Sequence, residues 1–373
     1  MASLTMGVAS CSSEEETAIA TSRPIAFVPS LTSFTFPTTR GEAVTKDNYA
    51  TKMASVGVWG FYASGATGKD VTAGSMYVGY TSSTGIELAN SNGVYDYANS
   101  ADIKNWPATT APLDFYAIHP YDAADTGEET VKPTITGDSQ SVYFVNDGYP
   151  SYGGECLTDL MYATASGLTA DSYNGTVPLE FRHALSQLTF RGVLADETLS
   201  VECEQISINN IGCEGTLSLS SGTWSGIDNI TYYLTPQTKK SIASTTDTVT
   251  LIGDDHAFML IPQTLTPWTT TSSNPVPITT ADSNKQCYLS MSCKIKKDGE
   301  YVVGSDDEYG KVYMPFGTEL GKMLEMGKKY EITLCFGLGY NEQGEKIEPS
   351  TTGPITYTVS VKDWSTTSVL ITM

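Results

Sequence analysis

A cysteine near the start of the chain lies in a pattern that permits acylation. Cys11 follows the small residues Val8-Ala9-Ser10 and precedes the polar, acidic run Ser12-Ser13-Glu14-Glu15-Glu16. This pattern is typical of a lipoprotein processing site, where a signal peptidase cuts before the cysteine and the thiol and new amino group are acylated. Two or three acyl chains, at about 0.8 kcal/mol per buried CH₂, hold a soluble domain on a membrane. The sequence therefore predicts lipidation at Cys11.

The alternative interpretation is that Cys11 is an ordinary cysteine in a polar tail. A secretory signal opens with Lys or Arg and continues with about 7 to 15 apolar residues. Met1 to Met6 supplies neither. We therefore expect that residues 1–23 are the remnant of a lipoprotein leader and a tether, with the basic and apolar part of the leader absent or truncated.

Histidines and acidic clusters are the other candidates for catalysis or metal binding. The three histidines, His119, His183 and His256, form no HExxH pair, and no GxSxG elbow is present. Asp254-Asp255 and Asp306-Asp307-Glu308 offer oxygen ligands for Ca²⁺ but lack the alternating D-x-[DN]-x-[DN]-G order. We expect structural histidines, solvated carboxylates, no metal, no cofactor and no enzyme. A hydrolase whose site assembles from distant residues is a separate hypothesis.

The remaining cysteines and the tryptophans leave alternatives open. The cysteines after Cys11 are Cys156, Cys203, Cys213, Cys287, Cys293 and Cys335, and no CxxC pair supports a zinc or thioredoxin-like site. They are either disulfide partners in an exported chain or small buried hydrophobes, and their pairing stays open. The tryptophans Trp59, Trp106, Trp224, Trp268 and Trp364 either lie in the core or include a sugar-stacking platform.

Composition limits the possible partners. The 373 residues carry a formal net charge of −21, which repels nucleic acid and anionic lipid, so we expect no nucleic-acid binding. No stretch approaches the roughly 20 apolar residues of a membrane-spanning helix. A length of 373 residues corresponds to about two domains. With 40% hydrophobic and 17% charged residues, the chain can form the hydrophobic cores that such domains need.

The elements that must position any site are short strands. Ile355 to Val361 alternates apolar with hydroxyl residues, and Tyr330 to Phe336 shows the same period of two. Val249 to Ile252 and the fully apolar Ala257 to Ile261 predict two more strands, and Lys297-Asp298-Gly299-Glu300 predicts a hairpin turn. Only Asp159 to Ala165 and Leu320 to Met326 suggest short helices, the second ending at Gly327. The Thr/Ser/Pro-rich residues 266–277 predict an exposed connection. The sequence predicts an all-β protein.

Several segments, taken in order along the chain, resemble the fimbrillin family of type V pilus subunits and accessory proteins. They are Ile25-Ala26-Phe27, Thr39-Arg40, Val56 to Phe61, Leu113 to Pro120, Asp159 to Ala163, Val177 to Phe190, Phe258 to Gln263 and Val361 to Trp364. Phe181 to Phe190 (FRHALSQLTF) and Leu260 to Gln263 (LIPQ) are the most specific of these. The resemblance implies two tandem transthyretin-like β-sandwich domains with few short helices, at residues 24–182 and 183–373. It also implies export as an outer-membrane lipoprotein displayed on the cell surface.

The resemblance further implies assembly by strand exchange. In polymerising members an arginine-specific, trypsin-like protease cuts after an arginine that follows the first strand, and a strand of the next subunit fills the vacated groove. Arg40 stands where that cut would fall, although it could equally be a solvated loop residue. The displaced strand would contribute Ile25, Phe27, Leu31, Phe34 and Phe36. The candidate donor strand of this chain contains Val369, Leu370 and Ile371.

Two features complicate that expectation. Pro29 cannot donate to a strand ladder, so the first strand should have an edge or a bulge there. The segment after Trp364 is short for a donor strand, which fits a tip subunit as well as a stalk subunit. The partners implied are other pilin subunits, the outer membrane through acyl chains, the protease, and a host protein or glycan at an adhesive tip. The rival hypothesis is a monomeric surface lipoprotein that binds a glycan or a host protein.

Overall fold

The structure of the chain is a computed structural model. It describes residues 23–31, 52–91, 93–108, 110–121, 129–146, 159–234, 239–318, 320–321, 323–347 and 355–363. Several predicted site residues lie outside these ranges, namely Cys11, Phe34, Phe36, Arg40, Val369, Leu370 and Ile371. The predictions made for them therefore stay predictions.

The first sheet is built mostly from the first half of the chain and has the strand order β1-β10-β9-β6-β2-β4-β5, with β3 beside β2. Its strands are β1 (Ala26–Leu31), β2 (Ser55–Tyr62), β3 (Met76–Val78), β4 (Ile86–Ser91), β5 (Val94–Tyr97), β6 (Leu113–His119), β9 (Met161–Leu168) and β10 (Thr176–His183). The β1–β10 pair is parallel and the other described pairs of this sheet are antiparallel.

This sheet curls until its two edge strands, β1 and β5, approach each other. The Phe27 and Tyr97 rings lie 5.8 Å apart, and the Tyr97 hydroxyl donates to the carbonyl of Ile25 at 2.9 Å. Every strand of the sheet contributes buried side chains to one core, which includes Val58 and Phe115. The sheet is therefore an incomplete barrel around its own core, with a seam between β1 and β5.

The outer side of the same sheet is also covered. On β2 successive residues serve two cores, because side chains alternate across a strand. Val56 and Val58 face the barrel core, while Trp59 and Phe61 pack in a second core with Phe144, which lies in another sheet. This double burial explains why β2 is apolar along most of its length.

The second half of the chain, together with two strands from the first half, forms two further sheets. One has the order β15-β11-β20-β21 with β16 beside β11, and the other has the order β18-β17-β12-β8-β7 with β13, β14 and β19 beside it. Their strands are β7 (Glu129–Ile135), β8 (Gln140–Asn146), β11 (Ser186–Leu194), β12 (Leu199–Ser218), β13 (Thr223–Leu234), β14 (Lys240–Ile242), β15 (Val249–Ile252), β16 (Phe258–Leu260), β17 (Tyr288–Lys297), β18 (Glu300–Val303), β19 (Gly310–Pro315), β20 (Lys328–Phe336) and β21 (Thr356–Asp363). The largest core lies between these two sheets.

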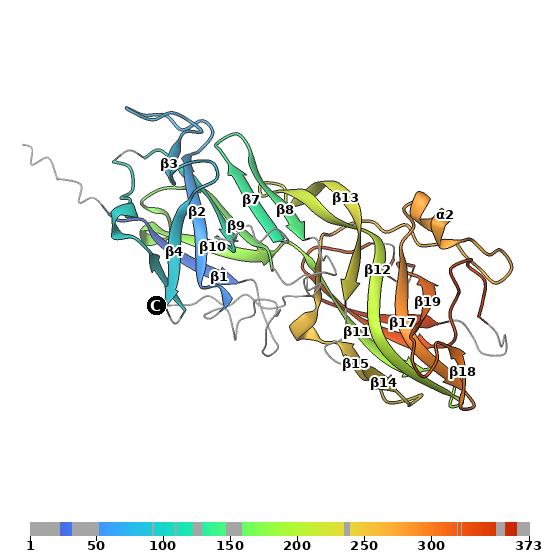
Figure 1. The fold of residues 1–373 in the computed structure, drawn as a ribbon. Coiled ribbons are helices and arrows are strands. Elements are labelled where there is room, and N and C mark those ends of the chain that lie inside the picture. The colour runs from blue at the N-terminus through green and yellow to red at the C-terminus, as the bar shows by residue number, and fades with distance from the viewer. Residues whose placement is uncertain are drawn as a thin grey trace, which may run out of the picture.

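The 20-residue strand β12 connects the two halves of the molecule. Its first part pairs with β17, and its last part pairs with β8, where Gly215 lies opposite Phe144. In Figure 1 the first sheet lies on the left, β17 and β19 lie on the right, and β7 and β8 lie between them. Strands from both sides of residue 183 therefore share one sheet. The domain boundary at 182/183 and the transthyretin-like arrangement stay predictions.

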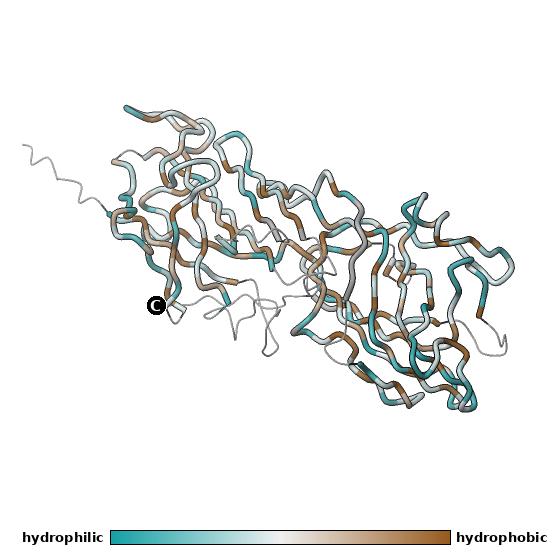
Figure 2. Tube along the Cα trace, viewed as in Figure 1, coloured by the Kyte–Doolittle hydropathy of each residue, from teal (hydrophilic) through white to brown (hydrophobic). Residues whose placement is uncertain are grey.

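The all-β class and the strands expected from alternation are confirmed. Tyr330 to Phe336 lies in β20 with every second residue buried, and Figure 2 shows hydrophobic and hydrophilic residues alternating along the strands. The hairpin turn is confirmed between β17 and β18, where Asp298 and Gly299 both have positive φ, 51° and 89°. Val361, the last apolar residue of the alternating segment Ile355 to Val361, is nevertheless exposed.

Two helix predictions are wrong. Asp159 to Ala165 lies mostly in strand β9. The described residues of Leu320 to Met326 form turns and an isolated bridge between Met323 and Thr264, because backbone groups of Leu324 and Gln263 pair at 2.9 and 3.1 Å. A short helix, α2 (Ile278–Ser283), lies instead after the Thr/Ser/Pro-rich connection. That connection is not uniformly exposed, since Trp268 within it is buried.

Candidate functional site

The first described strand, β1, lies at an edge of the curled sheet. It pairs in parallel with β10, from Ala26 opposite Thr176 to Leu31 opposite Phe181. Just before the strand, the N–H of Ile25 donates to the carbonyl of Lys104 at 2.8 Å. In the described residues, β10 is the strand that pairs with β1, so the other edge of β1 faces the seam.

The side chains predicted for the first strand hold it in the barrel core. Ile25 is 0% exposed and Phe27 is 6% exposed. The Phe27 ring packs edge-on against Tyr97 at 5.8 Å and against Phe115 at 5.7 Å. Leu31 is partly buried against the same core. The structure thus brings together Ile25, Phe27 and Leu31, and their displacement stays a prediction.

Pro29 fits this position without a bulge. It is buried, lies opposite Leu179 and continues the parallel register. A proline within a sheet is tolerated on an edge strand, where one side of the backbone makes no ladder bonds. The edge expected at Pro29 is therefore present.

A groove runs along the seam between β1 and β5. Its volume is about 280 Å³, and it is lined by residues 24–29, Leu88, residues 93–97 and Ile103. Val94 and Ile103 are exposed large hydrophobic residues on its wall, 61% and 45% accessible. The groove thus combines an edge of β1 with apolar side chains.

Tyr97 is the residue that ties the two sides of the seam together. Burial raises the pKa of Tyr97 to about 12, so the phenol stays protonated and can donate to the Ile25 carbonyl. No sequence pattern could have predicted this contact, because Tyr97 lies far from Ile25 along the chain and its strand is only four residues long.

The FRHALSQLTF segment has a structural role at the junction of the two halves. His183 Nδ1 lies 2.9 Å from Asp159 Oδ1, and both side chains are buried. The N–H of Ala184 donates to the carbonyl of Leu160 at 2.8 Å. The carbonyl of Ala184 accepts a hydrogen bond from Trp224 Nε1 at 2.9 Å. Two of the segments that carry the resemblance therefore interlock here, and the sequence could not show which contacts they make.

The LIPQ segment has a structural role too, because its glutamine side chain binds the backbone of a neighbouring strand. Gln263 Nε2 donates to the carbonyl of Gly212 at 2.9 Å, and Gln263 Oε1 accepts the N–H of Gly212 at 2.7 Å. These two bonds act at a place where the β12–β13 register shifts next to Gly212. The side-chain amide thus takes the place of a neighbouring strand.

The other chemical candidates lie in structural contacts. His119 Nδ1 lies 3.0 Å from the Ser55 carbonyl, and burial lowers the pKa of His119. Asp254 pairs with Lys329 at 2.6 Å, and Asp306 accepts a bond from Tyr301 at 2.9 Å. Within the described ranges, no group of three or more His, Cys, Asp or Glu side chains is arranged to hold a metal ion.

The tryptophans offer no stacking platform in the part of the chain that the structure describes. Trp59, Trp106 and Trp268 are at most 5% exposed. Trp224 is partly buried, with its ring 6.0 Å from Phe144. A membrane-spanning helix is likewise not found among the described residues.

The comparisons with known proteins identify the family. A profile of the fimbrillin-like family matches residues 39–364. The chain belongs to the fimbrillin-like family. A fimbrial protein from Bacteroides vulgatus ATCC 8482 is similar to this fimbrillin-like protein with 13% identity and a TM-score of 0.59, over 92% of this chain and 100% of the other. That likeness shows a shared fold.

Two further solved structures cover similar shares of the chain. A Bacteroides ovatus ATCC 8483 protein, provisionally described as a cell adhesion protein, has 15% identity and a TM-score of 0.47, over 92% of this chain and 99% of the other. The fimbrial anchor protein Mfa2 from Porphyromonas gingivalis has 12% identity and a TM-score of 0.34, over 93% and 100%. A search of curated protein sequences finds no match.

Proposed function

We propose that this fimbrillin-like protein is a structural or accessory subunit of a type V pilus that serves cell adhesion. The accessory positions considered include the tip of the pilus. In this proposal Cys11 is acylated and the exported chain reaches the outer membrane and cell surface. An arginine-specific protease then cuts after Arg40. The cut frees β1, and a strand from another pilin subunit takes its place, without a catalytic group or cofactor in this chain.

The position of β1 is the observation that carries the proposal. It is an edge strand with one paired neighbour among the described strands, and its other edge faces an apolar groove. A strand in this position leaves without breaking a ladder on its second side. The space it vacates would offer β10 as a template for main-chain bonds and pockets for alternate side chains, which is how β-augmentation gains affinity and specificity.

The burial of two side chains in and next to β1 indicates how strongly a replacement strand would bind. Ile25 and Phe27 are nearly fully buried, and each such side chain contributes roughly 1.5–3 kcal/mol. Together they give about 3–6 kcal/mol, a large part of the ~5–15 kcal/mol that typically separates folded from unfolded domains. A barrel without β1 would therefore gain substantially from an incoming apolar strand.

The proposed donor carries a matching pattern. Val369 and Ile371 are two residues apart, as are Ile25 and Phe27. Residues two apart point to the same face of a strand, so both pairs can fill adjacent pockets. This spacing supports Val369 to Ile371 as the segment that enters the groove of a neighbouring copy.

Treatment of the purified chain with an arginine-specific protease tests the proposal. We expect a cut after Arg40, followed by a ladder of oligomers on a denaturing gel run without boiling. The Arg40→Ala variant should stay uncut there and monomeric, and a Val369→Asp, Ile371→Asp variant should be cut but should not elongate. A wild-type chain that is cut at Arg40 and remains monomeric would contradict strand exchange.

The export step is tested separately. Cys11→Ser in a chain carrying its full leader should leave the protein out of the outer-membrane fraction and without incorporated labelled palmitate. A Cys156→Ser variant serves as the control because that cysteine is not in the processing pattern. Equal membrane recovery of the Cys11→Ser variant would contradict lipidation at Cys11.

A further inference from the structure

Two cysteines face each other across neighbouring strands in the largest core. Cys203 of β12 and Cys293 of β17 are directly opposite in the antiparallel register. Both are 0% exposed and belong to the same hydrophobic cluster. Both are reduced in the structure.

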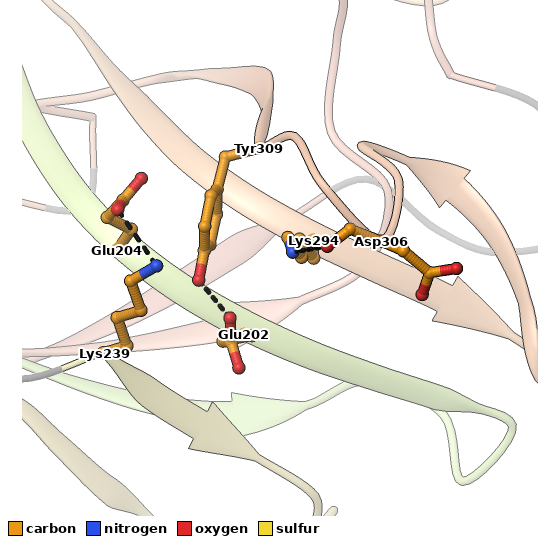
Figure 3. Close-up of polar contacts among 6 residues, drawn as sticks. All are labelled: Glu202, Glu204, Lys239, Lys294, Asp306 and Tyr309. Carbon is orange, nitrogen blue, oxygen red and sulfur yellow. Dashed lines mark hydrogen bonds and ion pairs between the residues drawn. The ribbon is translucent and has the colours of Figure 1, made fainter.

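The neighbouring side chains show which way these cysteines point. Glu202 and Glu204 lie on the outer face of β12, where Glu202 accepts a bond from the Tyr309 hydroxyl and Glu204 pairs with Lys239 at 3.4 Å (Figure 3). Lys294 lies on the same outer face of β17, with Nζ 4.8 Å from the Tyr309 ring centre. Because side chains alternate along a strand, Cys203 and Cys293 both point inward.

The two sulfur atoms are in contact. A side-chain hydrogen bond with Cys203, followed by burial, raises the pKa of Cys293. The Cys203 thiol donates to the carbonyl of Gln205 at 3.8 Å. The two cysteine side chains therefore lie close enough to interact.

The backbone spacing is close to that of a disulfide. Directly opposite residues on antiparallel strands have Cβ atoms roughly 4.5–5.5 Å apart, and a disulfide needs about 3.5–4.5 Å. The register shifts between Cys203 and Gln205. Since a bulge bends and twists its strand locally, β12 can make the small approach that remains.

We propose that Cys203 and Cys293 form a disulfide that links β12 to β17 when the chain folds in an oxidising compartment. A thiolate of one cysteine attacks a disulfide-bearing oxidant, one half of which leaves as a thiol after taking up the proton. The second cysteine then displaces the other half, so two S–H bonds become one S–S bond and the oxidant is reduced to two thiols. The oxidising compartment rests on the export in the proposed function.

Burial sets when the reaction takes place. In the folded chain both sulfurs are shielded, and the raised pKa keeps Cys293 protonated, so the folded reduced protein should react slowly. The bond therefore forms while the core closes. It then constrains a loop of about 90 residues and fixes β12, the strand that joins both halves, against β17.

The test maps the thiols of the full chain after refolding with a mixture of oxidised and reduced glutathione. Iodoacetamide is added in denaturant without reductant, and the digest is analysed by mass spectrometry. We expect the Cys203 and Cys293 peptides to be unalkylated and joined, lighter by two hydrogen atoms than their sum. The oxidised chain should also melt several degrees above the reduced chain.

Matched variants separate this link from general effects of cysteine removal. Cys203→Ser should leave Cys293 alkylated and abolish the difference in melting temperature. Cys213→Ser should retain the Cys203–Cys293 link and the melting difference, because Cys213 lies on β12 beyond the part paired with β17. Alkylation of both cysteines in wild type, or a link from either to another cysteine, overturns the proposal. This outcome needs only the wild-type chain and is independent of cleavage at Arg40.

Discussion

Replacing Phe27 with alanine tests how firmly β1 is held in the barrel. Phe27 is 6% exposed and contacts two aromatic rings at 5.7 and 5.8 Å. Truncating such a side chain to alanine costs about 3–5 kcal/mol, from lost transfer free energy and the cavity left behind. The matched control is Val28→Ala on the same strand, since Val28 is only partly buried and should lose less than about 1.5 kcal/mol.

Thermal and urea unfolding would measure this difference. For a unit of 150–250 residues, 1 kcal/mol shifts Tm by roughly 2–4 °C, so Phe27→Ala should lower Tm by about 6–20 °C. The urea midpoint should fall with an unchanged slope. After cleavage at Arg40, the weaker hold on β1 should also speed its release. A Tm within about 2 °C of the Val28→Ala variant would refute the packing of β1 described above.

Three further predictions concern contacts elsewhere in the described fold. The Gln263→Glu side chain cannot donate to the Gly212 carbonyl, so the free energy of unfolding in urea should fall by about 1–3 kcal/mol. An unchanged urea midpoint would show that the bonds between Gln263 and Gly212 do not stabilise the fold. Because burial lowers the pKa of His119, the unfolded chain binds more protons below about pH 6.5, so stability should fall as pH drops from 8 to 5.5. The His119→Gln variant should lose less stability over this pH range. If its stability depends on pH as that of the wild type does, His119 is not the cause of the fall. Trp224→Phe removes the bond to the Ala184 carbonyl and should lower stability by about 0.5–1.5 kcal/mol, measured by urea unfolding against wild type.

The elements that alternation predicts are those whose two faces differ in burial. β20 buries every second residue, so its sequence shows the period of two directly. The hairpin at Asp298-Gly299 was predictable because its positive φ angles restrict the residue types that fit. The two helix predictions failed because segments of seven residues carry too little periodicity to outweigh long-range pairing. Gln263 and Leu324 decide the second case, and they are distant in sequence.

The candidate site was only partly predictable for the same reason. The apolar spacing of Ile25 and Phe27 indicates a strand with one buried face. Nothing in that spacing shows that the strand is an edge, that its partner β10 runs parallel, or that Tyr97 lies across the seam. The pairing of Cys203 with Cys293 was equally hidden, because register between distant strands is set by the whole sheet. Side-chain type is local information, whereas pairing is not.

The most direct test of strand exchange follows the β1 segment itself. A peptide label placed between Pro24 and Arg40, at the exposed Ala26, would report its fate after cleavage with the arginine-specific protease. Exchange predicts that the label leaves the protein as a short peptide while unboiled oligomers accumulate in equal measure. A label that stays bound to cleaved monomers, or oligomers that form with the label still in place, would contradict the central claim that β1 is replaced by a strand from another subunit.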